Sequence, residues 1–309
     1  MPLGSSNKQT TNYIGRFAPS PTGPLHIGSL FAALGSFLQA KNNAGQWLVR
    51  MEDIDPPREV KGASTDILKT LERYHLYWDG EVNYQHNNQE QYNEYLDQLR
   101  KEEILYPCTC SRKTILENAQ FGPLGMIYTG KCRNTPLHTN QQHSLRMMMP
   151  DIDIEFADQI QARIQLNFNK NIGDVVLKRA DGFYAYHLAV VIDDYHQAVT
   201  EIVRGSDLLF STPVHLQLQQ YLGFNSPSYA HLPVIVNSKG EKLSKQTGAN
   251  KVDMENIDAT LIQLLNYLGQ NPPSELTEGS TDNILNWAIE NWQPENIPRV
   301  SIVKDELTC

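Results

Sequence analysis

Two segments of this 309-residue chain carry residue types that could bind and activate a nucleoside triphosphate. The first is the Pro- and Gly-rich loop of residues 19–24, which is followed by His26 and Gly28 where a helix is predicted to begin. A helix N-terminus offers unpaired N–H groups and the positive end of a dipole, and both favour a phosphate. His26 could also donate to a phosphate oxygen that gains charge in a transition state. A proline-rich turn with a surface histidine is the plainer interpretation.

The second segment is a basic loop, residues 239–245, with the sequence Lys-Gly-Glu-Lys-Leu-Ser-Lys. Its three lysines follow a predicted buried strand. A mobile basic loop can close over a polyphosphate and neutralise the charge that develops at an attacked phosphorus. A merely solvated basic loop would have the same composition, so this segment indicates phosphate chemistry only in combination with the first.

A third group of residues has a spacing close to that of a zinc site. Cys108 and Cys110 lie two residues apart, and Cys132 follows about twenty residues later. A fourth ligand must come from elsewhere, and His138 and His143 are the chemically usual candidates. Three unpaired structural thiols are the alternative interpretation.

The elements that must position these residues alternate along the first part of the chain. Residues 13–18 and 47–51 are predicted strands, and residues 30–43, 65–75 and 89–102 carry apolar side chains at helical spacing. Strands and helices that alternate at this pace predict parallel βαβ units, and therefore an α/β fold with a parallel sheet.

The alternation breaks at residue 107, and the irregular stretch that follows is interpreted as an insertion into the α/β domain. It contains a short alternating run at residues 160–168. In the later part of the chain, residues 198–203 and 232–236 are predicted strands with a predicted helix between them at residues 212–222. Two more helices are predicted at residues 258–268 and 283–292.

The charge of the chain limits its partners. It has 26 Lys and Arg against 35 Asp and Glu, a net charge of −9, and residues 252–309 alone carry ten acidic and two basic residues. This balance argues against indiscriminate binding to nucleic acid, but it allows a selective contact with RNA by the first 250 residues. There is no membrane-length apolar run or signal-peptide pattern, and the four cysteines do not make a disulfide scaffold. We therefore expect a soluble, cytoplasmic protein, and a monomer.

The His26 segment and the basic loop together resemble the paired signatures of class I aminoacyl-tRNA synthetases, usually written HIGH and KMSKS. Residues 16–28 (RFAPSPTGPLHIG), 50–55 (RMEDID) and 203–207 (VRGSD) narrow the resemblance to the glutamyl subgroup. The resemblance covers roughly residues 13–250. It implies a Rossmann-type catalytic domain that makes glutamyl-adenylate from glutamate and ATP, with Mg²⁺.

Two positions depart from the family pattern. Ser29 stands where the first signature has a second histidine, so it could donate only a neutral hydrogen bond. Residues 242–246 read Lys-Leu-Ser-Lys-Gln, with Leu and Gln in place of Met and Ser, but Lys245 keeps the lysine that the family uses on ATP. The resemblance implies catalytic roles for His26, Ser29, Lys242 and Lys245, and ATP binding by His26, Gly28 and Lys245.

The amino-acid pocket must hold the two carboxylates and one ammonium of glutamate, which requires an arginine fork and a protein carboxylate. We assign Glu52 to the ammonium, Arg16 with Tyr186 to the side-chain carboxylate, and Arg204 to the other carboxylate. A core tyrosine, and an ion pair between Arg204 and Asp207, are the alternatives. The glutamate-binding positions implied by the resemblance are Arg16, Ala18, Ser20, Glu52, Tyr186 and Arg204.

The metal pattern resembles one branch of the glutamyl family, the glutamyl-Q tRNA(Asp) synthetases. That branch implies Tyr128, four residues before Cys132, as the fourth ligand of one structural zinc ion with Cys108 and Cys110. About 60 acidic residues follow Asn250, enough for two or three helices, and we expect no anticodon-binding domain.

In that branch, glutamate is activated without tRNA and transferred to queuosine at the wobble position of tRNA(Asp). A truncated standard glutamyl-tRNA synthetase and an inactive zinc-containing RNA-binding paralogue are the alternatives, and Lys245 and Glu52 argue against the second. We expect a catalytic domain in two halves, residues 12–107 and 174–250. A zinc-containing insertion, residues 108–173, lies between the halves, and a helical C-terminal region covers residues 251–309.

Overall fold

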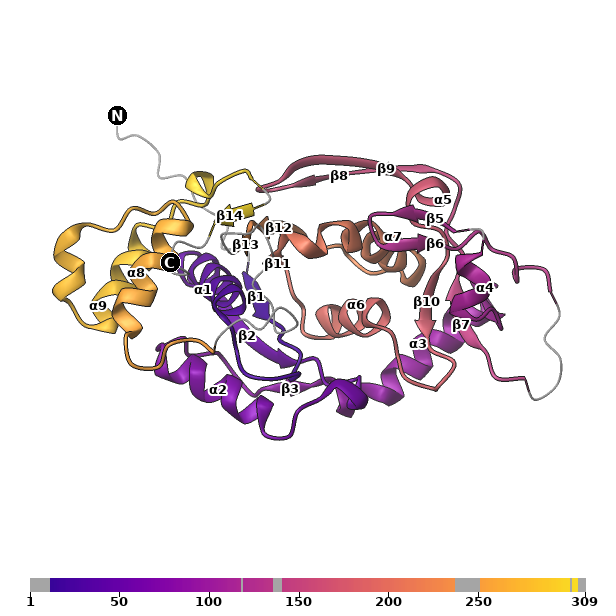
Figure 1. Ribbon diagram of the computed structural model, residues 1–309, viewed down its shortest axis with the longest axis horizontal. Coiled ribbons are helices and arrows are strands. Elements are labelled where there is room, and N and C mark those ends of the chain that lie inside the picture. Colours follow the sequence, from indigo (N-terminus) through magenta and orange to yellow (C-terminus); the bar gives the residue numbers. More distant parts are fainter. Residues whose placement is uncertain (1–11, 118, 136–140, 237–250, 301, 305–309) are drawn as a thin grey trace, which may run out of the picture.

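The computed structural model describes residues 12–117, 119–135, 141–236, 251–300 and 302–304. Its first unit is β1 (Ile14–Phe17), α1 (Ile27–Asn42) and β2 (Gln46–Met51). Strands β1 and β2 pair in parallel, with Ile14 opposite Gln46, and β2 continues in parallel to β3 (Asn83–Tyr84). The predicted parallel βαβ alternation is confirmed (Figure 1).

A later part of the chain extends this sheet. Strand β11 (Glu201–Gly205) lies beside β1, where the Thr200 N–H donates to the Ile14 carbonyl at 2.9 Å, and it pairs in parallel with β12 (Ser228–Leu232). The strands therefore follow the order β3, β2, β1, β11, β12, which is that of a doubly wound α/β sheet. In such sheets a ligand binds at the carboxyl ends of the strands.

One predicted strand, residues 232–236, is divided in the structure. Strand β12 ends at Leu232, and β13 (Val234–Val236) pairs instead with β14 (Ile302–Lys304). Pro233 stands between the two strands and has no N–H to donate, so a continuous ladder cannot pass through it.

Two apolar cores hold the helices. Helices α1 and α2 (Ala63–Arg73) share one core with the C-terminal helices α8 (Ile257–Tyr267) and α9 (Thr281–Glu290). The other core lies among α3 (Gln89–Lys101), α6 (Tyr186–His196) and α7 (Thr212–Leu222) and includes strands of the insertion. The expected C-terminal helices are present among the described residues. Short 3₁₀ helices lie at Pro56–Arg58, Gln85–Asn88, Ser206–Ser211, Ser274–Glu278 and Pro294–Asn296.

The insertion is built around an antiparallel sheet in the order β10 (Val175–Lys178), β7 (Ser144–Met147), β4 (Leu105–Cys108). A long hairpin, β8 (Asp153–Asp158) and β9 (Ala162–Asn167), runs from it towards β12 (Figure 1). The hairpin accounts for the alternating run predicted at residues 160–168. The smaller elements are α4 (Arg112–Leu116), β5 (Gln120–Gly122), β6 (Gly125–Ile127) and α5 (Phe168–Asn171).

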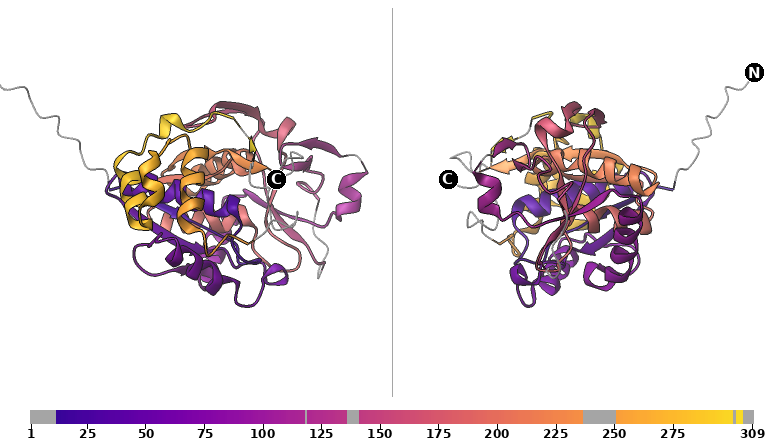
Figure 2. Two further views of the ribbon diagram at one scale, coloured as in Figure 1. Left: turned by 60° about the vertical axis from the view of Figure 1, so that its left-hand side comes forward. Right: turned by 90° about the vertical axis from the view of Figure 1, so that its right-hand side faces the viewer.

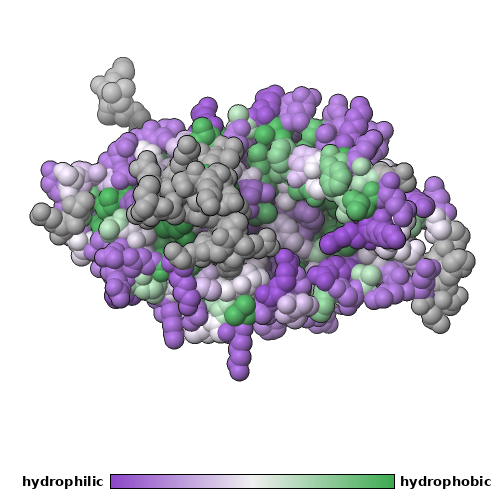
Figure 3. All heavy atoms as spheres, in the orientation of Figure 1, coloured by the Kyte–Doolittle hydropathy of each residue, from purple (hydrophilic) through white to green (hydrophobic). Residues whose placement is uncertain are grey.

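The C-terminal helices and the insertion lie at opposite ends of the molecule, with the parallel sheet between them (Figure 2). The face seen in Figure 3 is largely hydrophilic. Among the described residues, no helix combines the length and the apolar character that crossing a membrane requires.

Candidate active site

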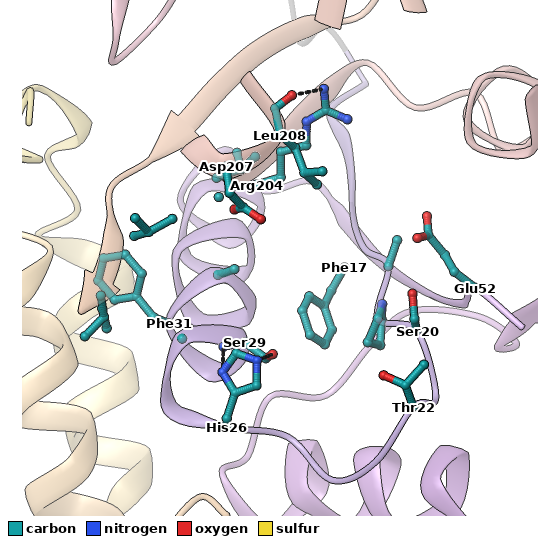
Figure 4. A pocket seen from close by; sticks show the side chains of 18 of the residues that line it. Phe17, Ser20, Thr22, His26, Ser29, Phe31, Glu52, Arg204, Asp207 and Leu208 are labelled. Atoms are coloured by element: carbon teal, nitrogen blue, oxygen red, sulfur yellow. Dashed lines mark hydrogen bonds between the residues drawn. The ribbon is translucent and has the colours of Figure 1, made fainter. Parts of the chain in front are cut away.

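A cavity of about 630 Å³ opens where β1, β2, β11 and β12 end. Figure 4 shows His26 and Ser29 at one end of it and Arg204 at the other, with Glu52 to one side. One end of the cavity therefore has a helix N-terminus, which suits a phosphate, and the other end has charged side chains. Nine residues that the sequence predicts for the site line it: Arg16, Ala18, Ser20, His26, Gly28, Ser29, Glu52, Tyr186 and Arg204.

The predicted Lys242 and Lys245 lie outside the described residues. The described residues on both sides of their loop are nevertheless at the site. Ile235 lines the cavity, and Lys251 forms a β-bridge with His26.

His26 caps the N-terminus of α1, which lies at the cavity. Its backbone is extended, and its Nδ1 accepts from the Ser29 N–H at 3.2 Å. A neutral ring that accepts at Nδ1 carries its proton on Nε2, which lies 3.0 Å from the Ser29 hydroxyl oxygen. His26 can therefore donate from Nε2 to an oxygen at the helix N-terminus. Ser29 orients the His26 ring and does not take over the role of the second histidine of the family signature.

Arg16 is held rigidly at the other end of the cavity. Its Nε and Nη2 donate to the two oxygens of Asp194 at 2.9 and 3.3 Å, and only 3% of Arg16 is exposed. Asp194 also accepts from Nη1 of Arg50 at 2.8 Å. Burial raises the pKa of Asp194, but the two guanidinium groups outweigh it and hold the pKa below its usual value. The cation at Arg16 is thus fixed in place by a buried carboxylate from α6.

Each guanidinium nitrogen of Arg204 already has a protein partner. Nε donates to His231 Nε2 at 3.0 Å, Nη1 to the Tyr186 hydroxyl at 3.0 Å, and Nη2 to Thr212 Oγ1 at 2.9 Å. Nη1 also lies 3.4 Å from His215 Nδ1. Burial raises the pKa of Tyr186, so its hydroxyl keeps its proton and can pass a hydrogen bond on to a carboxylate in the cavity.

Glu52 is the carboxylate that faces this cationic end. Its side chain is 10% exposed, and one oxygen lies 3.8 Å from Arg50 Nη2. Burial raises its pKa to about 7, although Arg50 and Arg16 oppose the shift and Asp194 and Asp193 add to it. The group is therefore a carboxylate above about pH 7 and a neutral acid below it, unless a cation binds beside it.

Sequence reasoning missed Asp194, Arg50, His231 and Asp158, all of which are buried around the site. A signal for Asp194 existed: the acidic pair Asp193-Asp194 ends an apolar run in a helix. Arg50 stands in the motif of residues 50–55 but was given no role there, and the sequence offered no signal for His231 or Asp158.

The predicted metal ligands converge in the insertion. The sulfur atoms of Cys108, Cys110 and Cys132 all lie within 4.8 Å of one another. The Tyr128 hydroxyl lies 3.3 Å from the Cys108 sulfur and 3.4 Å from the Cys110 sulfur, and it accepts from the Cys132 N–H at 3.0 Å. Three sulfurs and one oxygen around a common point suit a tetrahedral metal ion.

The two histidine alternatives have different outcomes. His143, which the structure describes, is not part of the cysteine cluster, and its Nδ1 lies 2.9 Å from the Gln141 carbonyl oxygen. His138 lies outside the described residues.

Hydrogen bonds from Tyr128 and the backbone overcome the effect of burial and lower the pKa of Cys132 to about 7.

Comparison with known proteins identifies close relatives. The family of class I tRNA synthetase (E and Q) catalytic domains matches residues 14–271. Glutamyl-Q tRNA(Asp) synthetase of Dechloromonas aromatica is 46% identical, with 94% of this chain and 97% of that protein covered. The protein of the same name from Neisseria gonorrhoeae is 47% identical, with 94% and 99% covered.

Solved structures agree in fold. The glutamate–tRNA synthetase of Elizabethkingia anophelis superposes with a TM-score of 0.79 at 25% identity and covers 96% of this chain. A glutamate tRNA ligase of Elizabethkingia meningosepticum, in complex with its amino acid, gives a TM-score of 0.78 at 26% identity over 94% of this chain. The chain spans 68% and 66% of the lengths of those two proteins.

Proposed function

We propose a function for this chain from its family, since it belongs to the class I tRNA synthetases of the glutamate and glutamine type and, among them, to the glutamyl-Q tRNA(Asp) synthetases. It activates glutamate with ATP and transfers the glutamate to queuosine of tRNA(Asp). The observation that carries the proposal is the match to relatives of that name over 97–99% of their length. The cavity supports it, because it combines a phosphate-binding helix end with charged groups suited to glutamate.

At the amino-acid end, Glu52 binds the ammonium of glutamate. Arg16, held by Asp194, and the hydroxyl of Tyr186 bind the side-chain carboxylate. Arg204 contributes through its charge and through its hydrogen bond to Tyr186, because its other nitrogens are engaged with the protein. The sequence analysis assigns Arg204 to a direct contact with a carboxylate of glutamate, whereas the role proposed here is indirect.

At the phosphate end, the N-terminus of α1 and Nε2 of His26 bind ATP, whose phosphates are accompanied by Mg²⁺. Lys242 and Lys245 close over these phosphates during adenylate formation. The support for this step is that Ile235 and Lys251, on the two sides of the basic loop, are both at the cavity.

In the insertion, Cys108, Cys110, Cys132 and Tyr128 bind one zinc ion. The support is their convergence within a small buried cluster and a donor set that is typical of structural zinc. When bound, the ion supplies folding free energy to the insertion rather than chemistry to the reaction.

Transfer to queuosine needs no further catalytic group. Its cyclopentene diol resembles the ribose diol of a tRNA 3′ end, so one hydroxyl can attack the glutamyl-adenylate and release AMP. A base in a loop is accessible because it can be splayed out and bound individually. We also propose that the enzyme acts in the cytoplasm as a monomer.

The test of the function is to offer labelled glutamate and ATP with tRNA(Asp) that contains or lacks queuosine, and with tRNA(Glu). Label should appear only on queuosine-containing tRNA(Asp), and it should persist when the 3′-terminal diol is oxidised while the modified base is protected. Label on queuosine-free tRNA(Asp) or on the 3′ end of tRNA(Glu) would instead indicate a standard glutamyl-tRNA synthetase. ATP–pyrophosphate exchange with glutamate alone should proceed. A standard glutamyl-tRNA synthetase is expected to exchange only when tRNA is added, and an inactive paralogue should not exchange at all.

Glutamate binding should weaken as the pH falls through about 7. The raised pKa of Glu52 means that the free site loses its carboxylate below that pH, and the ammonium then has no partner. The KM for glutamate in ATP–pyrophosphate exchange should therefore rise at acid pH. Glu52→Gln should raise KM about tenfold or more and abolish its pH dependence. The exposed Glu59→Gln is the matched control, and a similar effect from it would contradict the role of Glu52.

A further inference from the structure

The tip of the β8–β9 hairpin carries a carboxylate that is completely buried. Asp158 ends β8, and its side chain has 0% exposure. Its Oδ1 accepts from the N–H groups of Ile160, Gln161 and His231 at 3.0, 2.8 and 3.1 Å, and its Oδ2 lies 2.5 Å from Nδ1 of His231. The hairpin, which begins in the insertion, therefore contacts β12 of the parallel sheet through this carboxylate, and also through the Gln159 N–H and the Gln161 side chain, which donate to the Tyr229 and His231 carbonyls at 3.0 and 2.8 Å.

His231 connects this carboxylate to the cavity. Its ring is also fully buried, with Nδ1 facing Asp158 and Nε2 facing Nε of Arg204 at 3.0 Å. The Arg204 Nε always carries a hydrogen, so Nε2 of His231 must accept, and the proton of the neutral ring must be on Nδ1. The carboxylate of Asp158 accepts that proton, so one tautomer satisfies both neighbours.

The next link reaches the glutamate pocket. Nη1 of Arg204 donates to the Tyr186 hydroxyl at 3.0 Å, and both residues line the cavity. The series of hydrogen bonds thus runs from Asp158 through His231 and Arg204 to Tyr186. It joins a residue on an insertion hairpin to the hydroxyl that faces the substrate carboxylate.

From this geometry we propose that Asp158 and His231 are positioning residues for glutamate binding. Asp158 holds the proton of His231 on Nδ1, so that Nε2 accepts from Arg204 and orients the guanidinium and, through it, the Tyr186 hydroxyl. The inference rests on the proposed function, because Tyr186 and Arg204 are taken as parts of the glutamate pocket. It adds that the insertion supplies a residue on which the amino-acid pocket depends.

Asp158→Asn tests the proposal with almost no change in volume. Oδ1 of Asp158 accepts three backbone N–H groups, so the amide oxygen must take that place and the amide NH₂ must face Nδ1 of His231. That NH₂ would force the proton to Nε2, where it opposes the Arg204 Nε–H. We expect the KM for glutamate to rise roughly tenfold to a hundredfold in ATP–pyrophosphate exchange, with a smaller change in kcat and none in the KM for ATP.

The matched control is Asp153→Asn at the other end of the same strand. Asp153 is exposed and accepts from Asn167 Nδ2 at 2.9 Å, so the same chemical change is made without touching the cavity. It should leave both KM values unchanged. Equal glutamate KM values for folded Asp158→Asn and for wild type would overturn the proposal and leave Asp158 a merely structural residue.

A second pair of variants keeps the proposal testable if Asp158→Asn does not fold. His231→Gln can bring an amide oxygen near the former Nε2 to accept from Arg204, whereas the shorter His231→Asn reaches only towards Asp158. Glutamate affinity should be better retained in His231→Gln than in His231→Asn, and the reverse order would overturn the proposal.

Imidazole ¹⁵N NMR provides a readout that does not depend on activity. Wild type should show His231 neutral and protonated on Nδ1, and Asp158→Asn should show it protonated on Nε2. A wild-type Nε2–H tautomer would overturn the proposed arrangement. If wild type failed to exchange pyrophosphate with glutamate, the proposed function would fail, while the tautomer result would still report on the link between Asp158 and Arg204.

Discussion

The purified protein should carry one zinc ion per chain, and Cys132→Ser should remove it and unfold the insertion around residues 108–135. Besides the proposed ligands, Ile127 is the one buried apolar residue among the described residues of this stretch. Structural zinc can supply on the order of 10 kcal/mol of folding free energy to a small module. Metal analysis should therefore show loss of zinc, and hydrogen exchange should show loss of protection across residues 108–135.

Two variants separate the proposed ligand set from its alternatives. Tyr128→Phe removes only the hydroxyl that lies between the sulfurs, and it should lower zinc content and Tm. His143→Ala removes the histidine that lies outside the cluster, and it should change neither. Full zinc occupancy in Tyr128→Phe, or loss of zinc in His143→Ala, would contradict the assignment of the fourth ligand.

The convergence of Cys108, Cys110, Cys132 and Tyr128 could be predicted from the sequence because all four come from one short stretch of chain. Two of the cysteines are two residues apart, and Tyr128 lies four residues before Cys132, so spacing and family resemblance together were sufficient. The same is true of His26 and Gly28, which lie where a Pro/Gly loop meets a helix. Local sequence determines where such residues point.

The groups that orient the arginines could not be predicted in this way. Asp194 meets Arg16 across 178 positions of the sequence, and Asp158 meets His231 across 73. A polar residue that will be buried opposite a distant partner looks, in one sequence, like any polar surface residue. Only the packing of α6 and of the β8–β9 hairpin against the parallel sheet brings these partners together.

This difference changes the interpretation of Arg204. Its spacing after a strand and its family motif predict a free fork for a carboxylate. In the structure its nitrogens are already distributed among His231, Tyr186 and Thr212. An arginine held in this way loses little conformational freedom when the substrate binds, and the Tyr186 hydroxyl that it orients is ready to donate. In the proposed glutamate pocket, we therefore expect part of the selectivity to come from residues that do not touch glutamate.

Lys245→Ala should lower the rate of ATP–pyrophosphate exchange by about 10²-fold or more, while glutamate affinity changes much less. The residues proposed to bind glutamate, Arg16, Glu52 and Tyr186, all line the cavity. Lys245 is proposed to act at the other end, on charge that grows on the phosphates as the adenylate forms. Loss of one donor aimed at a transition-state charge typically costs that much in rate.

The same loop contains the control. Lys239→Ala removes an equal charge six residues earlier, at a position outside the family signature. If Lys245 acts by aimed contact, Lys239→Ala should lower exchange far less, and the difference between the two variants should persist at high salt, which screens general electrostatic attraction. If the loop acted only by raising the local positive potential, both variants would lose a similar, salt-sensitive amount. A Lys245→Ala enzyme with altered glutamate affinity but unchanged turnover would place Lys245 in substrate binding instead. Because His26 remains to donate at the helix N-terminus, residual exchange in Lys245→Ala should still exceed the rate without enzyme.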